Sequence, residues 1–489
     1  MKEHLDERRR WLALLVLCLG ELMIVLDTTI VNVALPSIRQ DLQFSETALV
    51  WVVNAYMLTF GGFLLLGGRL GDLYGQRRIF LLGLVLFTLA SLACGLAGSQ
   101  SVLITARAIQ GLGGAVVSAV ALSLIMNLFT EDGERAKAMG VYGFVCAGGG
   151  SVGVLLGGLL TDSLSWHWIF LVNLPIGILV YWLCLRLIPA LPGQIETDPS
   201  GNSKLDIGGA VTVTASLMLA VYAVVDGNEA GWTSLQTLGL LGLSVLLMLV
   251  FLWLEATVRQ PLMPLGLFRL RNVAVANVVG VLWAAAMFAW FFISALYMQL
   301  VLAYTPMQVG LAFLPANLIM AAFSLGLSAK IVMRFGIRAP LAGGLLLAGI
   351  GLALFARAPV NGDFWLDILP GMVLSGIGAG IALNPVLLAA MSDVEQSESG
   401  LASGIVNTSF MMGGALGLAV LASLAAAQTH GVSASGGDDL SALNAGYQTA
   451  FLIGAGFALL AALLGGLLLR TRRSDSAEVP GTAAAPALD

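Results

Sequence analysis

The sequence predicts an all-α membrane protein, and three features support this fold class: an excess of apolar residues, a scarcity of charges, and apolar runs of membrane-spanning length. Of its 489 residues, 58% are hydrophobic and only 10% are charged, whereas an ordinary soluble domain has about 25% charged residues. The 59 glycines fit the same class, because small residues let helices approach closely in lipid. A water-soluble globular protein is therefore excluded.

An α-helix needs about 20 apolar residues to cross the hydrocarbon core of a bilayer, and runs of this length follow one another along the chain. The first run is not expected to be a cleaved signal peptide, since it stays apolar up to Pro36 and lacks a small-residue cleavage pattern. An even number of spans would put both ends of the chain on one side. We place fourteen spans near residues 11–35, 47–67, 79–98, 102–126, 138–160, 168–188, 207–225, 235–254, 273–298, 307–329, 339–356, 366–390, 401–427 and 448–469.

The basic residues test this count independently, because cytoplasmic loops of membrane proteins are enriched in Lys and Arg. With the N-terminus inside, all but three of the 23 Lys and Arg residues fall on inner segments. The exceptions are Arg39 and Arg357 in outer loops and Arg107 inside a span. One span more or fewer would destroy this alternation, so both termini are expected in the cytoplasm. The net charge of −5 gives no indication of a nucleic-acid partner.

Two short patterns recur in the second half of the chain, each displaced by eight predicted spans. The loops at residues 68–78 and 330–338 both end in Gly-x-Arg at the start of the next span, and glycine clusters occupy residues 111–114 and 376–380. If the repeating units are six-span bundles, spans seven and eight are an inserted central pair. We therefore predict a first bundle at 1–190, a linker and central pair at 191–265, a second bundle at 266–470, and a disordered cytoplasmic tail at 471–489.

Three charged side chains lie deep within predicted spans, where a charge costs at least about 2.5 kcal/mol and is a functional hypothesis by default. Glu21 and Asp27 are in span one, and Arg107 is in span four. Six residues separate the two acids, about 240° around a helix, so they do not share a face. At most one of them needs to point to the same cavity as Arg107. Acids nearer to span ends are interpreted as interfacial residues: Asp206, Asp226, Glu255 and Asp367.

The deep acids suggest proton coupling. Removal from water favours the neutral form of a carboxyl group, so such an acid can take up a proton on one side of a membrane and release it on the other. Arg107 would favour the ionised form and so set when release happens. The alternative is a structural ion pair that only holds spans one and four together. Spans nine to fourteen contain no deep charge, so proton handling is expected in the first bundle.

Four stretches of the chain carry a family likeness. They read LDTTIVNVALP at residues 26–36, GRLGDLYGQRR at 68–78, RAIQG at 107–111 and WIFLVNLPIG at 168–177. Together they resemble the major facilitator superfamily, and specifically its fourteen-span drug:proton antiporter branch. The resemblance implies two six-helix bundles plus two extra central helices, in the cytoplasmic membrane of a bacterium. It also implies that Asp27 takes part in coupling or cation recognition and Arg107 in proton transfer.

The chain departs from this branch in span five. The branch has a Gly-Pro pair ahead of Gly-Gly, but residues 149–158 read GGSVGVLLGG, with Val154 in place of the proline. Because proline kinks a helix, its loss predicts a straighter span. The remaining small residues are still suited to close helix packing, and they are Gly149, Gly153, Gly157 and Gly158.

The loop at residues 68–78 is expected to form part of the inner gate. Asp72 ends span two, and Arg77 and Arg78 begin span three, so these charges can form ion pairs across the two bundles while the inner side is closed. A partly exposed pair contributes about 0 to 1 kcal/mol, which is weak enough to break in each cycle. Gly68 and Gly75 leave room for the approach. The alternative is that the basic residues only fix the topology.

Spans two and nine carry aromatic side chains that can line a central cavity. Aromatic faces attract organic cations, so an acid beside aromatic rings fits an amphipathic, cationic, drug-like substrate. Much of any such set must face lipid or neighbouring helices. The residues expected to bind substrate are Asp27, Glu21, Trp51, Asn54, Tyr56, Gln110, Phe288 and Phe292.

An enzymatic function finds little support in the sequence. No GxxxxGK[ST] loop is present to bind ATP phosphates, and no long polar segment can form a catalytic domain. The four cysteines show no metal-ligand spacing and the three histidines are scattered, so no metal site is expected. We expect no cofactor, with a proton gradient as the energy source.

These observations predict a monomeric, proton-driven exporter of lipophilic, cationic, drug-like compounds that works by alternating access. An exporter of a native lipid or secondary metabolite is the alternative within transport. A non-transporting membrane receptor or scaffold is the alternative from another class, although it would not need Asp27 and Arg107 at depth. The expected partners are small molecules, protons and the bilayer, and the sequence leaves open whether a periplasmic adaptor protein joins them.

Overall fold

The computed structural model describes residues 7–129, 131–189, 206–258, 261–323, 327–391, 393–394 and 399–470. Within these ranges the chain forms helices and no β-strand. Residues 190–205 of the predicted linker region and the predicted tail at 471–489 lie outside the described residues. Among the described residues, thirteen helices are long and apolar enough to cross a membrane, and a shorter apolar helix, Pro306–Ala322, corresponds to the tenth predicted span.

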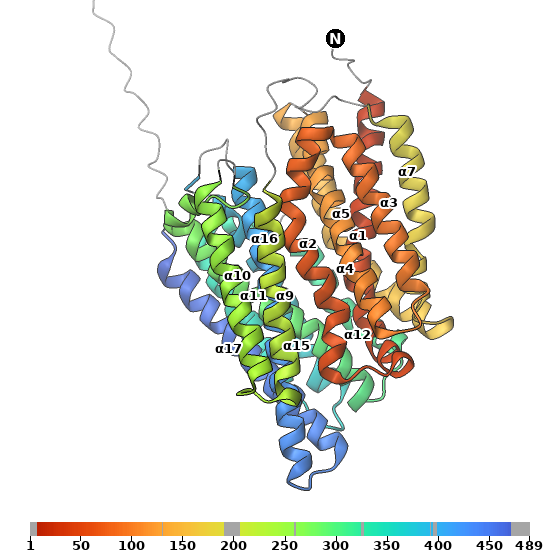
Figure 1. The fold of residues 1–489 in the computed structure, drawn as a ribbon, viewed down its shortest axis with the longest axis vertical. Coiled ribbons are helices and arrows are strands. Elements are labelled where there is room, and N and C mark those ends of the chain that lie inside the picture. Colours follow the sequence, from red (N-terminus) through yellow and green to blue (C-terminus); the bar gives the residue numbers. More distant parts are fainter. Residues whose placement is uncertain are drawn as a thin grey trace, which may run out of the picture.

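The first six predicted spans form a group of helices around the N-terminal helix (Figure 1). The sixth span consists of two helices in succession, because the helix is interrupted at Val172. The elements are α1 (Glu7–Leu42), α2 (Glu46–Tyr74), α3 (Gln76–Gly95), α4 (Gln100–Leu128), α5 (Asp132–Ser163), α6 (Trp168–Leu171) and α7 (Asn173–Leu187).

The last six predicted spans form a second group of helices. The ninth span, α11, is preceded by the short helical turn η1 and followed by the short helical turn η2. The short helix α13 follows the tenth span, α12. The elements are η1 (Leu265–Arg269), α11 (Arg271–Leu296), η2 (Tyr297–Val301), α12 (Pro306–Ala322), α13 (Ser328–Phe335), α14 (Arg338–Phe355), η4 (Phe364–Ile368), α15 (Leu369–Met391), α16 (Ser399–Ala434) and α17 (Asp439–Leu468).

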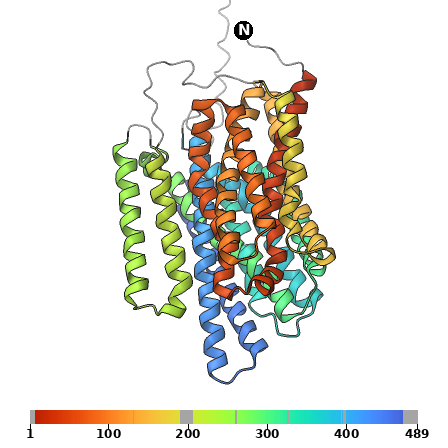
Figure 2. The same cartoon turned by 45° about the vertical axis from the view of Figure 1, so that its right-hand side comes forward.

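Spans seven and eight are α9 (Ile207–Ala230) and α10 (Leu235–Thr257), which stand to one side of the other helices in Figure 2. Two reciprocal hydrogen bonds join them: Ser216 Oγ donates to the Ser244 carbonyl at 2.7 Å, and Ser244 Oγ donates to the Ser216 carbonyl at 2.8 Å. Only 17% of the most apolar 18-residue stretch of α10 is buried inside the protein. This is expected for a helix that faces lipid. α9 packs against both α2 and α16, so it contacts both groups of helices.

Local sequence explains several helix starts. Thr305 and Gln308 form a capping box at the start of α12, where Pro306 occupies the first turn. Ser45 accepts a hydrogen bond from the Ala48 N–H at the start of α2. Such side chains satisfy backbone N–H groups that have no partner within the helix.

The two repeated Gly-x-Arg loops have a common backbone feature. Gly75, which ends α2, has φ of 96°, and Gly336, which ends α13, has φ of 74°. A residue with a Cβ atom adopts such positive φ values only at a cost, whereas glycine adopts them freely. Both loops therefore use glycine to turn the chain before the next helix begins.

The two repeated glycine clusters also pack in the same way. A Cβ atom on Gly113 of α4 would lie 2.6 Å from the backbone nitrogen of Phe87 in α3, and one on Gly378 of α15 would lie 2.5 Å from the backbone nitrogen of Ala348 in α14. Both distances are shorter than real contacts allow. Span four therefore meets span three, and span twelve meets span eleven, through direct backbone approach.

Candidate functional site

Asp27 and Arg107 form a buried ion pair between α1 and α4. Arg107 Nη1 lies 2.5 Å from Asp27 Oδ2. The two residues are 0% and 1% exposed, so neither charge reaches the surface of the protein. The structure thus brings together the only deep base of the sequence and one of its two deep acids.

Polar side chains from three other helices complete the surroundings of the Asp27 carboxylate. Its Oδ1 atom accepts hydrogen bonds from Gln110 Nε2 at 2.7 Å and from Asn173 Nδ2 at 3.0 Å. Gln110 Nε2 also donates to Ser91 Oγ at 2.8 Å. Asp27, Ser91, Gln110 and Asn173 come from α1, α3, α4 and α7, so the carboxylate is the point where these helices meet.

Arg107 is held by contacts beyond its ion pair. Its Nε donates to the Val52 carbonyl at 2.8 Å, and its Nη1 donates to Gln110 Oε1 at 2.7 Å. The guanidinium carbon lies 4.4 Å from the centre of the Tyr56 ring and 5.6 Å from that of Phe170. Because aromatic faces stabilise cations, this setting favours the charged guanidinium away from water.

The buried pair has a clear energetic consequence. Breaking a buried ion pair by removing one partner costs about 3–5 kcal/mol, because the other charge stays buried without a counterion. A proton on Asp27 would remove its negative charge and leave the buried Arg107 guanidinium without a counterion. Neutralising Asp27 would therefore destabilise the arrangement of α1 and α4 seen here.

Glu21 precedes Asp27 in α1, nearer to the N-terminal end of the helix, and has a different environment. It is 6% exposed, and Ser118 Oγ of α4 donates to its Oε1 at 3.0 Å. No cationic side chain pairs with Glu21 in the described part of the chain. Ser118 follows Arg107 by eleven residues, about three turns, so one side of α4 meets both acids at two different depths.

The glycines of the span-five motif pack mainly against α1 near Asp27. A Cβ atom on Gly153 would lie 2.1 Å from Thr29 Oγ1, and one on Gly157 would lie 2.7 Å from the Ile30 carbonyl oxygen. On Gly149 it would lie 3.0 Å from Leu22 and Val25 side chains. The stripe therefore brings α5 against the segment of α1 that carries Asp27.

Gly158 and Val154 instead meet the second group of helices. A Cβ atom on Gly158 would lie 2.7 Å from the Pro306 carbonyl oxygen, and one on Gly310 of α12 would lie 3.0 Å from the Val154 carbonyl oxygen. α5 runs without interruption from Asp132 to Ser163. The motif thus joins α5 to α12 across the two groups of helices.

The residues expected to bind substrate do not all meet at one place. Tyr56 and Gln110 belong to the surroundings of the ion pair. Asn54 donates to the Ala415 carbonyl of α16 at 2.8 Å, and Trp51 packs against Tyr222 of α9, with ring centres 6.4 Å apart.

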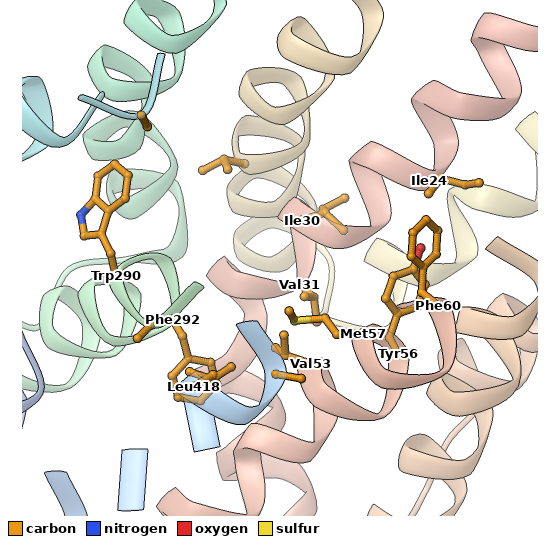
Figure 3. Packing of buried hydrophobic residues seen from close by; sticks show 14 of the residues in the cluster. Ile24, Ile30, Val31, Val53, Tyr56, Met57, Phe60, Trp290, Phe292 and Leu418 are labelled. Atoms are coloured by element: carbon orange, nitrogen blue, oxygen red, sulfur yellow. The ribbon is translucent and has the colours of Figure 1, made fainter. Parts of the chain in front are cut away.

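Phe288 and Phe292 belong to α11. Phe292 is buried, and Figure 3 shows it beside Leu418, on the side that faces Val53 and Met57 of α2. Phe288 packs edge-on against Phe410, with ring centres 5.9 Å apart. A surface hollow between α3 and α4 has none of the expected substrate residues in its lining, so the substrate cavity stays a prediction.

The gate loop is ordered by contacts within the first group of helices. Arg77 Nη2 donates to the Leu185 carbonyl of α7 at 2.9 Å, and Gln76 Nε2 donates to Asp72 Oδ1 at 3.4 Å. A Cβ atom on Gly68 would lie 3.8 Å from the Ala119 side chain, an ordinary contact. Gating by Asp72, Arg77 and Arg78 stays a prediction.

Sequence reasoning missed two residues of the site. Asn173 stands inside the family-like stretch at 168–177 and is a polar residue in an apolar run, so it could have been chosen. Ser91 gave no such signal, because a serine in a helix commonly bonds to its own backbone. Its hydroxyl indeed donates to the Phe87 carbonyl at 2.9 Å while it accepts from Gln110.

Comparison with known proteins identifies the family. Residues 17–418 match the model of the Major Facilitator Superfamily. A puromycin resistance protein of Streptomyces alboniger is 38% identical and aligns over 98% of this chain and 95% of its own length. A cephamycin export protein of Amycolatopsis lactamdurans is 38% identical over 94% and 93%. The multidrug resistance protein Stp of Mycobacterium tuberculosis is 37% identical over 86% and 76%.

Solved structures agree in fold. The nucleoside transporter NupG superposes with a TM-score of 0.67 at 13% identity, covering 94% of this chain and all of that one. The xylose transporter XylE of E. coli gives 0.61 at 15% identity, covering 94% and 97%. The expected fold of about fourteen membrane-spanning helices is confirmed. The chain therefore belongs to the major facilitator superfamily, and it is a multi-pass membrane transporter rather than an enzyme.

Proposed function

We propose that the protein exports lipophilic, cationic, drug-like compounds in exchange for protons, by alternating access between the two groups of helices. The observation that carries this proposal is the fully buried Asp27–Arg107 pair. Ionisable residues inside a membrane are costly to bury, and in transporters they mark proton pathways. The proton gradient supplies the energy, and no bound cofactor is needed.

Asp27 is the proposed exchange point. Its ionised form is stabilised by Arg107, Gln110 and Asn173. A proton or a cationic substrate can each compensate the same negative charge, so the two compete for one carboxylate. Binding of substrate from inside then releases the proton inward, and protonation from outside expels the substrate.

Glu21 is the proposed second acid of this exchange. Its carboxyl group is buried and is paired with no cation in the described part of the chain, with the Ser118 hydroxyl as a donor. Because an unpaired buried carboxyl group favours its neutral form, Glu21 is suited to carry a proton between Asp27 and the inner side. By the distribution of Lys and Arg, the N-terminal end of α1 is that inner side.

The names of the relatives support the export of antibiotics. They are named for puromycin resistance, cephamycin export and multidrug resistance, and a further relative for tetracenomycin C resistance and export. The aromatic residues Trp51, Tyr56, Phe288 and Phe292, with Asn54 and Gln110, are proposed to contact substrate once the helices separate.

Substrate-induced proton release tests the mechanism. Purified protein in weakly buffered detergent solution should release protons when a lipophilic cationic dye is added. Asp27→Asn should abolish this release, because the amide cannot exchange a proton. Asp226→Asn is the matched control, since Asp226 is a half-buried acid of α9 that binds Gln236 at 2.7 Å. Unchanged release in Asp27→Asn would contradict the assignment.

The alternatives have their own tests. The antibiotic-specific names of three relatives favour one of them, an exporter dedicated to a secondary metabolite. Dye efflux in a strain without its own multidrug pumps would support the broad substrate range, and efflux of a single antibiotic alone would support the dedicated exporter.

A further inference from the structure

Two acids at one end of the α9–α10 pair lie outside the site described above. Asp206 is 6% exposed and Glu255 is 4% exposed, so both are more than nine-tenths buried. Their interpretation as interfacial residues does not account for this burial. By contrast, Asp226 and Asp367 are only half-buried.

Each of the two carboxyl groups uses one oxygen atom and leaves the other without a partner. Asp206 Oδ1 accepts the Gly209 N–H at 2.7 Å, and Glu255 Oε2 accepts the Met263 N–H at 2.9 Å. The remaining atoms, Asp206 Oδ2 and Glu255 Oε1, are buried and make no hydrogen bond within the described part of the chain. Such atoms are costly unless something binds them.

The two free oxygen atoms converge on the same space. A Cβ atom on Gly209 would lie 2.6 Å from Asp206 Oδ2 and 2.9 Å from Glu255 Oε1. Because glycine has no Cβ atom, this position stays open between the two carboxyl groups. The two oxygen atoms therefore flank one point beside the Gly209 Cα atom.

The groups packed around this end of the helix pair are apolar. Met263 and Met412 pack with Val213 and Phe251, and Met263 also packs against the cluster that contains Ile405. In the described part of the chain, Asp206 is the charged side chain that faces Glu255, and neither acid has an ion pair. The basic residues 204 and 259 lie outside the described residues. Two ionised carboxylates here would repel each other at low dielectric.

We propose that Asp206 and Glu255 share a single proton and so form a second proton-binding site, separate from Asp27. Glu255 Oε1 carries the proton and donates it to Asp206 Oδ2. Asp206 keeps the negative charge, because it caps the N-terminus of α9, where the helix dipole and backbone N–H groups favour an anion.

The shared proton would hold the helix pair to the second group of helices. Met263, whose N–H binds Glu255, begins the segment that leads through η1 into α11. The same residue packs near Met412 and Ile405 of α16. Loss of the proton leaves two like charges, which push Glu255 away and remove the acceptor of the Met263 N–H. This site does not depend on which compound the protein exports.

Infrared difference spectroscopy of the purified full chain tests the proposal. A neutral carboxyl group gives a carbonyl band that an ionised one lacks. At neutral pH the wild-type spectrum minus the Glu255→Gln spectrum should contain such a band, because the contribution of Glu21 cancels, and the wild-type spectrum minus the Asp226→Asn spectrum should not contain it. Asp206→Asn should shift the band, because the proton then faces an amide. If Glu255→Gln does not fold, the shift in Asp206→Asn decides the question.

Two results would overturn the proposal. Identical spectra of wild-type protein, Glu255→Gln and Asp206→Asn at neutral pH would mean that both acids are ionised. Loss of the band when sodium replaces choline at constant pH would mean that the site holds a metal cation instead. Hydrogen exchange adds a second readout: corrected for its intrinsic rate, the Met263 amide should lose protection as pH rises in wild-type protein but not in Glu255→Gln.

Discussion

The Asp27–Arg107 pair allows a quantitative prediction about stability. Asp27→Asn has nearly the same shape, so the change removes a charge and little volume. Arg107 then keeps its bonds to the Val52 carbonyl and Gln110 but has no counterion. The new amide keeps only one acceptor oxygen, so its NH2 group must face a donor, either the guanidinium or the amides of Gln110 and Asn173.

The size of the effect follows from these contacts. The lost bond is a charge-assisted one at 2.5 Å between residues that are almost wholly buried, and such bonds contribute about 1.5–3 kcal/mol. The uncompensated buried cation raises the total to about 3–5 kcal/mol. Arg107→Gln should cost a similar amount, because Asp27 then keeps only its two amide donors.

The double variant Asp27→Asn with Arg107→Gln separates pairing from packing. It leaves two neutral amides, which can bond to each other, so its cost should be smaller than the sum of the single costs by at least about 2 kcal/mol. Equilibrium unfolding in mixed detergent and SDS micelles, followed by circular dichroism, gives the three free energies. Additive costs, or a cost below about 1 kcal/mol for Asp27→Asn, would refute the buried ion pair.

Three other changes have defined expectations in the same unfolding assay. Glu21→Gln should change stability by less than about 1 kcal/mol, because the amide still accepts from Ser118 and no ion pair is lost; a cost like that of Asp27→Asn would reveal a missed cationic partner. Gly113→Ala should cost about 1–3 kcal/mol, since its Cβ atom would strike the Phe87 backbone, whereas Gly143→Ala, with open space around it, should be neutral or stabilising. Asn228→Ala should cost about 1–3 kcal/mol, because Asn228 donates to the Ser423 carbonyl at 2.8 Å and joins α9 to α16; no loss would mean that this junction holds through apolar packing alone.

The fold was predictable because lipid leaves a helix few alternatives. Every backbone polar group in hydrocarbon must be satisfied within the segment, so apolar length alone located the spans, and the structure confirms them. The interruption at Val172 was not predicted. Hydropathy averages over many residues and does not report such local changes of helix geometry.

The candidate site was predictable only in its charges. Asp27 and Arg107 stand out because a charge at depth is expensive. Gln110, Asn173 and Ser91 complete the same network, but amides and hydroxyls are cheaper to bury and many occur in spans without a role. These three residues can be recognised as part of the site only from the interatomic distances in the structure.

The sequence by itself predicted about fourteen spans, a repeat and the deep charges, because these depend on composition and order along the chain. Only the tertiary structure decided that Arg107 pairs with Asp27 rather than Glu21. It also decided that Asp206 and Glu255, 49 positions apart in the sequence, direct their free oxygen atoms into one space. Such pairing depends on how helices cross and where glycine leaves room, and hydropathy along a single chain contains neither.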